Sequence, residues 1–377
     1  MASLTWHSWF YKIKGTASSD DTPTTDTGIM VRGSDFKGEP NLQEEDWEAN
    51  CGGASNLIGS DRVSADSEPE WEQKVVFGEF FEDAFYMLLG DAQISPVTGN
   101  DNIKHWVITK EGTKLPVATI RNAFYYDDTN DPYKTTIYDN AKMSELEIGF
   151  DDKGLTQTNK LSSNAPIINS RNPVEKTLSA YLSKAGLNDF KVYMAEVGTG
   201  MYDLVSNEVV DDKLTNDIEC LISGKASFNN NLDDFACLGT AFGKNVKDAG
   251  NFEAEGELEL KWNSSGQGLN GSKTIIDKWF DTDAPNTVEG RHDLKLTDKT
   301  RNVELLIVCN NKVENGKVVE SFAMYYPKVQ ITKAWSDNSG DDTKKVNVEY
   351  KVVSNGTTSP VIVDIITGYQ SINKEDA

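Results

Sequence analysis

Hydrophobic and polar positions alternate along much of this chain. In residues 145–150 Leu, Ile and Phe lie on one side and glutamates and a glycine on the other, and residues 253–262 repeat this pattern. A period of two is typical of β-strands that bury one face and expose the other. The pattern and the turn residues between its segments predict further strands at 6–13, 28–31, 106–109, 116–120, 192–194, 218–222, 303–309, 318–326, 329–335, 346–352 and 361–366.

Helical periodicity is confined to a few places. Apolar side chains recur at helical spacing within residues 81–88, and Gly90 stands where a helix commonly ends. Residues 172–185 predict a second helix, with Asn172 as its N-cap and Pro173 in its first turn. Ser272 is a possible cap for a short helical turn.

These elements predict a mainly β protein, a sandwich or barrel with one or two packed helices and long loops. Residues 1–70 are polar and irregular, with a Ser/Thr/Asp run and an acidic patch. We expect them to form an N-terminal arm with loops, or a partly disordered tail, and residues 71–377 to form the β domain.

The charge balance narrows the classes of partner. The chain of 377 residues has 60 acidic and 37 basic residues, a formal net charge of −23. Binding of nucleic acid by phosphate neutralisation needs Lys and Arg, and anionic membranes attract the same residues. We therefore expect the protein to bind neither nucleic acid through its phosphates nor an anionic membrane surface. No apolar run has the length of a membrane span.

Sequence motifs for catalysis or metal binding are missing. The three histidines have no zinc-type spacing, and no nucleophile elbow, P-loop or dinucleotide fingerprint is present. The four cysteines are far apart, which favours free thiols over a metal site or a disulfide framework. We predict no catalytic residue, no metal and no cofactor. A glycosidase, which needs only two suitably spaced carboxylates, is a third and weaker hypothesis.

Acidic clusters between strands have two interpretations. Residues 127–131 and 337–342 could bind calcium through oxygen ligands, but neither matches an EF-hand loop. Asp, Asn and Gly are also the ordinary residues of turns, and we favour turns.

Two predicted strands carry rows of glutamates on one face. The ordinary interpretation is a solvated outer face, and the functional one is an acidic wall of a channel. A negative lumen would repel a phosphate backbone and let a duplex slide without sticking. The candidate lumen-facing residues are Glu145, Glu147, Glu255, Glu257 and Glu259.

The order of several short motifs resembles the tail tube (major tail) proteins of long-tailed bacteriophages. The likeness covers residues 71–369, and each motif is weak alone. It includes the 77–90 helix ahead of His105, Leu115-Pro116 with Thr119-Ile120, and Tyr138 before Ser144-Glu145-Leu146. It continues with Asn229-Asn230-Asn231-Leu232, Phe252 before Gly256-Glu257-Leu258, and Tyr326-Pro327-Lys328-Val329.

This resemblance implies a structural virion protein and no enzyme. Subunits of the family form hexameric rings whose sheets join edge to edge, and the rings stack into a tube that delivers genomic DNA. Implied partners are other copies of the chain, a tape-measure protein, tail terminator and baseplate or tip proteins, and passing double-stranded DNA. The implied location is the virion tail, assembled in the host cytoplasm.

Two expectations remain beside this hypothesis. The chain is longer than the simplest tube proteins, so an outward insertion is expected around residues 164–217. The alternative function is a β-sandwich adhesin or carbohydrate-binding domain of a tail fibre or baseplate, which would expose an aromatic platform.

Overall fold

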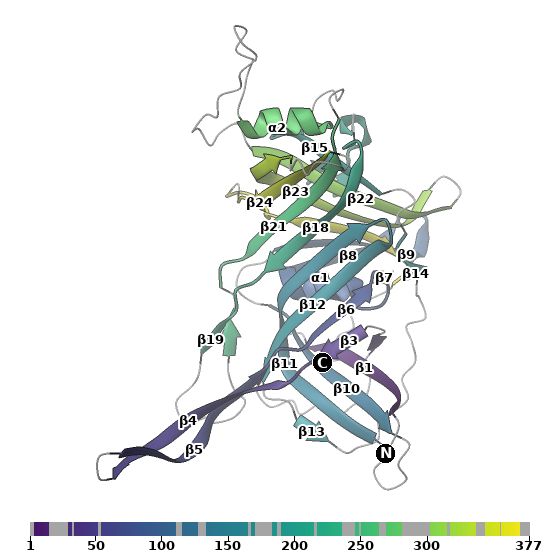
Figure 1. Cartoon of the computed structure of the whole chain (residues 1–377). Coiled ribbons are helices and arrows are strands. Elements are labelled where there is room, and N and C mark those ends of the chain that lie inside the picture. The colour runs from purple at the N-terminus through teal and green to yellow at the C-terminus, as the bar shows by residue number, and fades with distance from the viewer. Residues whose placement is uncertain are drawn as a thin grey trace.

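The protein is built almost entirely from antiparallel strands, as the sequence predicted. The computed structural model describes residues 4–14, 29–31, 34–51, 54–110, 115–126, 133–164, 167–169, 183–186, 190–214, 217–235, 246–248, 250–263, 269–280, 302–314, 317–336, 344–354 and 356–369. Two sheets pack face to face, a third continues from one of them, and a long hairpin projects from the body (Figure 1).

Sheet I contains both strands that carry the predicted glutamate rows. Its strand pairings are antiparallel, and each strand alternates between a buried and an exposed side. Its strands, in spatial order, are β3 (Ser34–Lys37), β6 (Glu70–Lys74), β12 (Gly154–Asn164), β11 (Tyr133–Asp151), β18 (Leu221–Asn229), β21 (Glu253–Lys261), β24 (Lys345–Val352) and β23 (Lys317–Trp335).

Sheet II forms the other layer of the sandwich and shares the long strand β23 with sheet I. Its spatial order is β15 (Phe190–Glu196), β22 (Asn302–Glu314), β23, β25 (Ile362–Thr367), β9 (Asn100–Lys110) and β8 (Gly90–Val97).

Strand β23 joins the two layers because its halves have different neighbours. Residues 321–325 pair with β25, and residues 329–335 pair with β24. Pro327 lies between the halves and has no N–H to donate to a ladder. The sequence predicted two strands here, and the structure has one continuous strand that passes from sheet II to sheet I.

Helix α1 (Phe81–Leu89) fills the space between the layers. The ring of Phe85 lies 6.1 Å from that of Phe228 in sheet I and 5.8 Å from that of Phe322 in sheet II. The helix ends as predicted at Gly90, whose φ of 98° belongs to the left-handed region that glycine adopts without strain. All of its residues are buried, including Glu82 and Asp83.

A third sheet and a hairpin extend the body at the lower end of the view in Figure 1. The predicted N-terminal strands are present in sheet III, but the hairpin lies where the sequence analysis expected loops. Sheet III runs β2 (Ile29–Val31), β1 (Leu4–Lys14), β10 (Val117–Tyr126), the first half of β11, and β13 (Ile167–Asn169); the hairpin is β4 (Pro40–Cys51) with β5 (Ala54–Ser67).

The remaining elements are short. The predicted helix at 172–185 falls largely outside the described residues, and its last part, Ser183–Lys184, is strand β14. The predicted turn at Ser272 is helix α2 (Ser272–Phe280), which contacts β23. The small pairs are β7 (Val76–Phe77) with β14, β16 (Tyr202–Asp203) with β17 (Glu208–Val209), and β19 (Asp233–Phe235) with β20 (Val246–Asp248); a 3-10 turn, η1, covers Asp211–Lys213.

Neither α1 nor α2, the helices of the described residues, has the length and apolar composition that a membrane span requires.

Candidate functional site

The structure brings all five predicted glutamates onto one exposed face of sheet I. Strand β18 lies between β11 and β21, and its Ser227 pairs with Glu147 on one side and Glu255 on the other. Paired residues of antiparallel strands point to the same face. Two segments more than 100 residues apart in the sequence therefore form one continuous surface.

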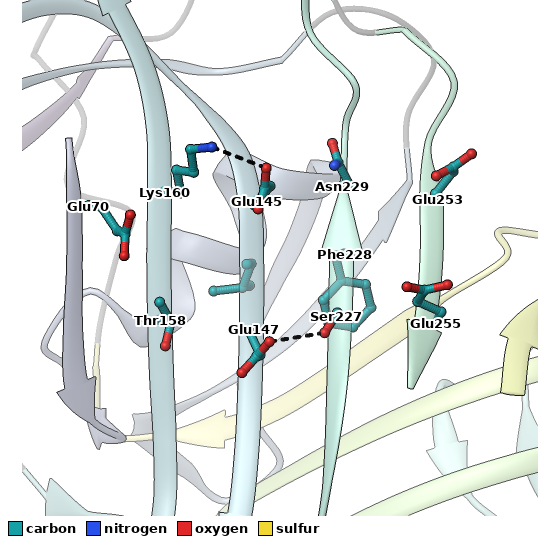
Figure 2. A pocket seen from close by; sticks show the side chains of 11 residues that line it. Glu70, Glu145, Glu147, Thr158, Lys160, Ser227, Phe228, Asn229, Glu253 and Glu255 are labelled. Atoms are coloured by element: carbon teal, nitrogen blue, oxygen red, sulfur yellow. Dashed lines mark hydrogen bonds and ion pairs between the residues drawn. The ribbon is translucent and has the colours of Figure 1, made fainter. Parts of the chain in front are cut away.

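A shallow pocket of about 370 Å³ lies in this face. Figure 2 shows Glu145, Glu147, Glu253 and Glu255 around it, with Lys160 on β12. Ser227 donates a hydrogen bond from its hydroxyl to Glu147 at 3.3 Å. The pocket is thus a part of the charged face.

Lysines from neighbouring strands interleave with these glutamates, and sequence reasoning missed them. Lys225 of β18 stands between β11 and β21 and contacts a glutamate on each. Each predicted glutamate has a lysine ammonium within 4.0 Å: Glu145 with Lys160 at 3.4 Å, Glu147 with Lys225 at 3.3 Å, Glu255 with Lys351 at 3.6 Å, Glu257 with Lys225 at 4.0 Å, and Glu259 with Lys345 at 2.8 Å.

The face is therefore mixed in charge, with a small acidic excess. Cross-strand pairing from β6 to β23 places nine glutamates and seven lysines on it. They are Glu70, Glu72, Glu145, Glu147, Glu253, Glu255, Glu257, Glu259 and Glu349, with Lys74, Lys160, Lys225, Lys261, Lys333, Lys345 and Lys351. The expected row of glutamates is present, but the face is not a purely acidic wall.

Most of these ion pairs are well exposed to solvent. The side chains of Lys225 and Glu147 are 41% and 43% exposed. Exposed pairs of this kind contribute between nothing and about 1 kcal/mol each to stability. Their main effect is on the surface: they hold charge of both signs in fixed, hydrated rows.

Lys160 of β12 is the lysine that lines this pocket. Partial burial lowers its pKa, but the carboxylates of Glu145 and Glu68 outweigh burial and hold the pKa above its ordinary value. Lys160 therefore stays charged throughout the physiological range and anchors β12 to the glutamate row.

The structure shows no cluster suited to a metal ion within the part of the chain that it describes. The acidic clusters at 127–131 and 337–342 lie outside that part, so their interpretation as turns stays a prediction. Cys220 is exposed and Cys309 is buried, and both are free thiols. The side chains of the other two cysteines are not among those described.

Comparison of the sequence with protein-family models found no match. A comparison with curated proteins found none either.

Proposed function

We propose that the chain is the tail tube subunit of a long-tailed bacteriophage, a structural virion protein without enzymatic activity. It self-assembles into stacked hexameric rings around a channel for genomic DNA. The observation that carries this proposal is the charged face of sheet I, which runs unbroken from β6 to β23. The ordered motifs that resemble the family support it as well.

The chemistry of the face suits a wall past which a duplex slides. A phosphate backbone binds where several basic side chains are free to neutralise it. On this face five lysines contact carboxylates, and glutamates outnumber lysines. Such a surface offers DNA no cluster of unpaired cations.

Features at the margins of the fold support self-assembly. Among the described residues β8 pairs only with β9, so one side of it is an open sheet edge. Open edges invite pairing with another chain. The β4–β5 hairpin projects from the body (Figure 1), and a two-stranded hairpin is marginally stable alone in water. Contacts with further copies would satisfy both features.

Negative-stain electron microscopy of the concentrated protein tests the proposal. We expect rings or hollow tubes with a bore that admits a duplex. Discrete particles at every concentration, also after addition of tail-tip or baseplate proteins as initiators, would contradict it.

A charge-reversal pair tests which face lines the channel. Glu257→Lys with Glu259→Lys should leave tubes intact and slow DNA ejection, because two new cations would bind phosphate. Asp211→Lys, on the outer face of sheet II, is the control. Equal ejection rates for both variants in intact tails would mean that sheet I does not line the lumen.

The remaining partners belong to the same proposal. A tape-measure protein would occupy the channel during assembly, terminator and baseplate or tip proteins would close its ends, and the virion tail would be the location.

One observation favours the second candidate, an adhesin or carbohydrate-binding domain. The indole of Trp335 is 50% exposed and packs edge to face against Trp279 at 6.3 Å between ring centroids. An exposed, rigidly held aromatic ring is a common platform for sugars and for protein partners. Binding of glycans by particles that never form tubes would favour this candidate over the tube.

A further inference from the structure

The outer face of sheet II carries a groove that the proposed tube function does not use. Its volume is about 620 Å³, within the range of roughly 300–1,000 Å³ of small-molecule sites. Residues of β23 alternate here: Phe322 and Met324 point into the core, whereas Ala323 lines the groove. The groove therefore faces away from the charged face of sheet I.

A loop, residues 197–214, packs on part of this outer face and forms one wall of the groove. We call this loop the flap. Beneath it Tyr193, Leu306, Tyr325 and Ile362 form a separate apolar cluster with Met201 and Tyr202 of the flap.

The carboxylate of Glu304, only 3% exposed, fixes the start of the flap. It accepts hydrogen bonds from the backbone N–H groups of Gly198 at 2.6 Å, Gly200 at 3.1 Å and Met201 at 3.2 Å. A buried carboxylate that receives several amide donors is strongly held in place. The flap is thus built onto the sheet in a defined position.

Asp364 fixes the middle of the flap and joins it to the groove floor. The hydroxyl of Tyr202 donates to Asp364 at 2.9 Å, and Nε2 of His105 lies 3.0 Å from the other oxygen of the same carboxylate. The ring of Tyr202 stacks on Tyr325 at 5.4 Å. The wall of the groove is therefore formed before any ligand arrives, which lowers the entropic cost of binding.

The floor of the groove alternates between small apolar and polar side chains. One cross-strand row carries Lys191, Val308, Ala323 and Asp364, and the next carries Asn310, Ser321, Ile366 and His105. The flap adds Asn207, Glu208, Val209 and Asp211, strand β8 adds Ser95, and the β8–β9 turn adds Thr98.

The lining carries charges of both signs, with an acidic excess. Lys191 and His105 lie with Glu208, Asp211 and Asp364, so an anion such as phosphate finds no cluster of cations, and no group suited to a metal ion is present among the described residues. Amides and hydroxyls supply both donors and acceptors. The best-fitting ligand is uncharged, carries many hydroxyls and presents apolar C–H faces to Val308 and Ala323.

We propose that this groove is a binding site for a neutral oligosaccharide. The inference does not depend on the tube proposal, because the groove and the charged face lie on opposite sides of the sandwich. In an assembled tube lined by sheet I, the groove would face outward and would be open to glycans of the surroundings.

Binding of neutral oligosaccharides to the full chain tests the proposal. Oligomers of glucose, galactose, mannose and N-acetylglucosamine would be screened by saturation-transfer NMR and measured by calorimetry. We expect at least one to bind with a Kd of about 1 mM or tighter. Ala323→Phe should weaken that binding at least tenfold by filling the floor. Asp211→Asn, at an exposed position that does not threaten folding, should weaken it several-fold.

Two variants serve as controls. Ser227→Phe also replaces a small side chain with phenylalanine, but on the charged face, and should leave the Kd unchanged. Trp335→Ala, at the exposed aromatic pair, should leave the Kd unchanged as well. Absence of binding across the panel would overturn the proposal. The proposal would also be overturned if only acidic glycans bound, if both groove variants left binding unchanged, or if Trp335→Ala alone abolished binding. Tube formation is scored separately by microscopy, so either proposal can fail without the other.

Discussion

Lys225 of β18 places its ammonium 3.3 Å from the carboxylate of Glu147 on the adjacent strand β11. The same ammonium lies 4.0 Å from Glu257 on the strand at its other side, β21. One lysine thus balances two rows of glutamates that would otherwise repel each other across the sheet. This arrangement allows a dense set of carboxylates to share one face.

Removing this lysine charge should cost little stability, because the contacts are exposed. We expect Lys225→Gln to lower the free energy of unfolding by less than about 1 kcal/mol, and its double-mutant coupling with Glu147→Gln to be about 0.2–1 kcal/mol. Urea unfolding in low and high salt measures both quantities. The coupling should shrink in high salt through screening. A coupling that is independent of salt would show that the pair does not act through its charges.

The glutamate rows could be predicted from the sequence, and the lysines between them could not. Alternation within a single strand determines that Glu145 and Glu147 share a face. Which lysines join them depends on how β12, β18 and β24 are paired with β11 and β21, and a shift of one residue would move Lys225 to the core side. Register is a tertiary property that a pattern along one strand does not contain.

The same limit explains the other differences. The helix at 81–89 and the main strands followed from periodicity and turn residues. The β4–β5 hairpin was missed because its acidic stretch lacks the apolar alternation of a half-buried strand. The groove on sheet II was missed because its lining comes from seven separate segments, whose only sequence signal is small residues such as Ala323 on an outer face.

Gly256 permits close contact between two strands and a tyrosine. A Cβ there would collide with the hydroxyl of Tyr350 and with the backbone carbonyl of Lys225. Since backbone cannot move aside as a flexible side chain can, Gly256→Ala should destabilise the protein by about 1–3 kcal/mol. Gly149→Ala is the matched control, because its Cβ would meet only the Thr156 hydroxyl, at 2.7 Å. Thermal unfolding compares the two, and equal losses would contradict this account.

Glu82 should make stability depend on pH. Burial raises its pKa to about 8 in the folded protein, although hydrogen bonds from the Gly78 N–H at 2.9 and 3.0 Å oppose this shift. The unfolded chain releases this proton near its ordinary pKa of 4.5, so between pH 4.5 and 8 the folded state binds more protons. The contribution is therefore fully present below about pH 4.5 and is lost as the pH rises toward 8.

Glu82→Gln mimics the protonated side chain and isolates this effect. Wild-type stability should fall relative to the variant by about 1.4 kcal/mol per pH unit within that window. Urea unfolding at several pH values between 5 and 8 gives the difference. Parallel pH profiles for the two proteins would mean that Glu82 is ionised in the fold.

Glu304 should control the order of the flap more than the stability of the whole protein. Its carboxylate accepts three backbone N–H groups, and Glu304→Gln replaces one acceptor oxygen with an amide that faces those donors. Leaving buried donors unpaired costs about 1–3 kcal/mol. Hydrogen exchange of the peptide that covers residues 197–201 should then accelerate by roughly tenfold or more, because 1.4 kcal/mol corresponds to a factor of ten.

Strand β21 in the opposite layer should exchange as before. Glu208→Gln, in the same flap but without these amide contacts, is the control. Uniform acceleration across both layers would instead make Glu304 a determinant of global stability.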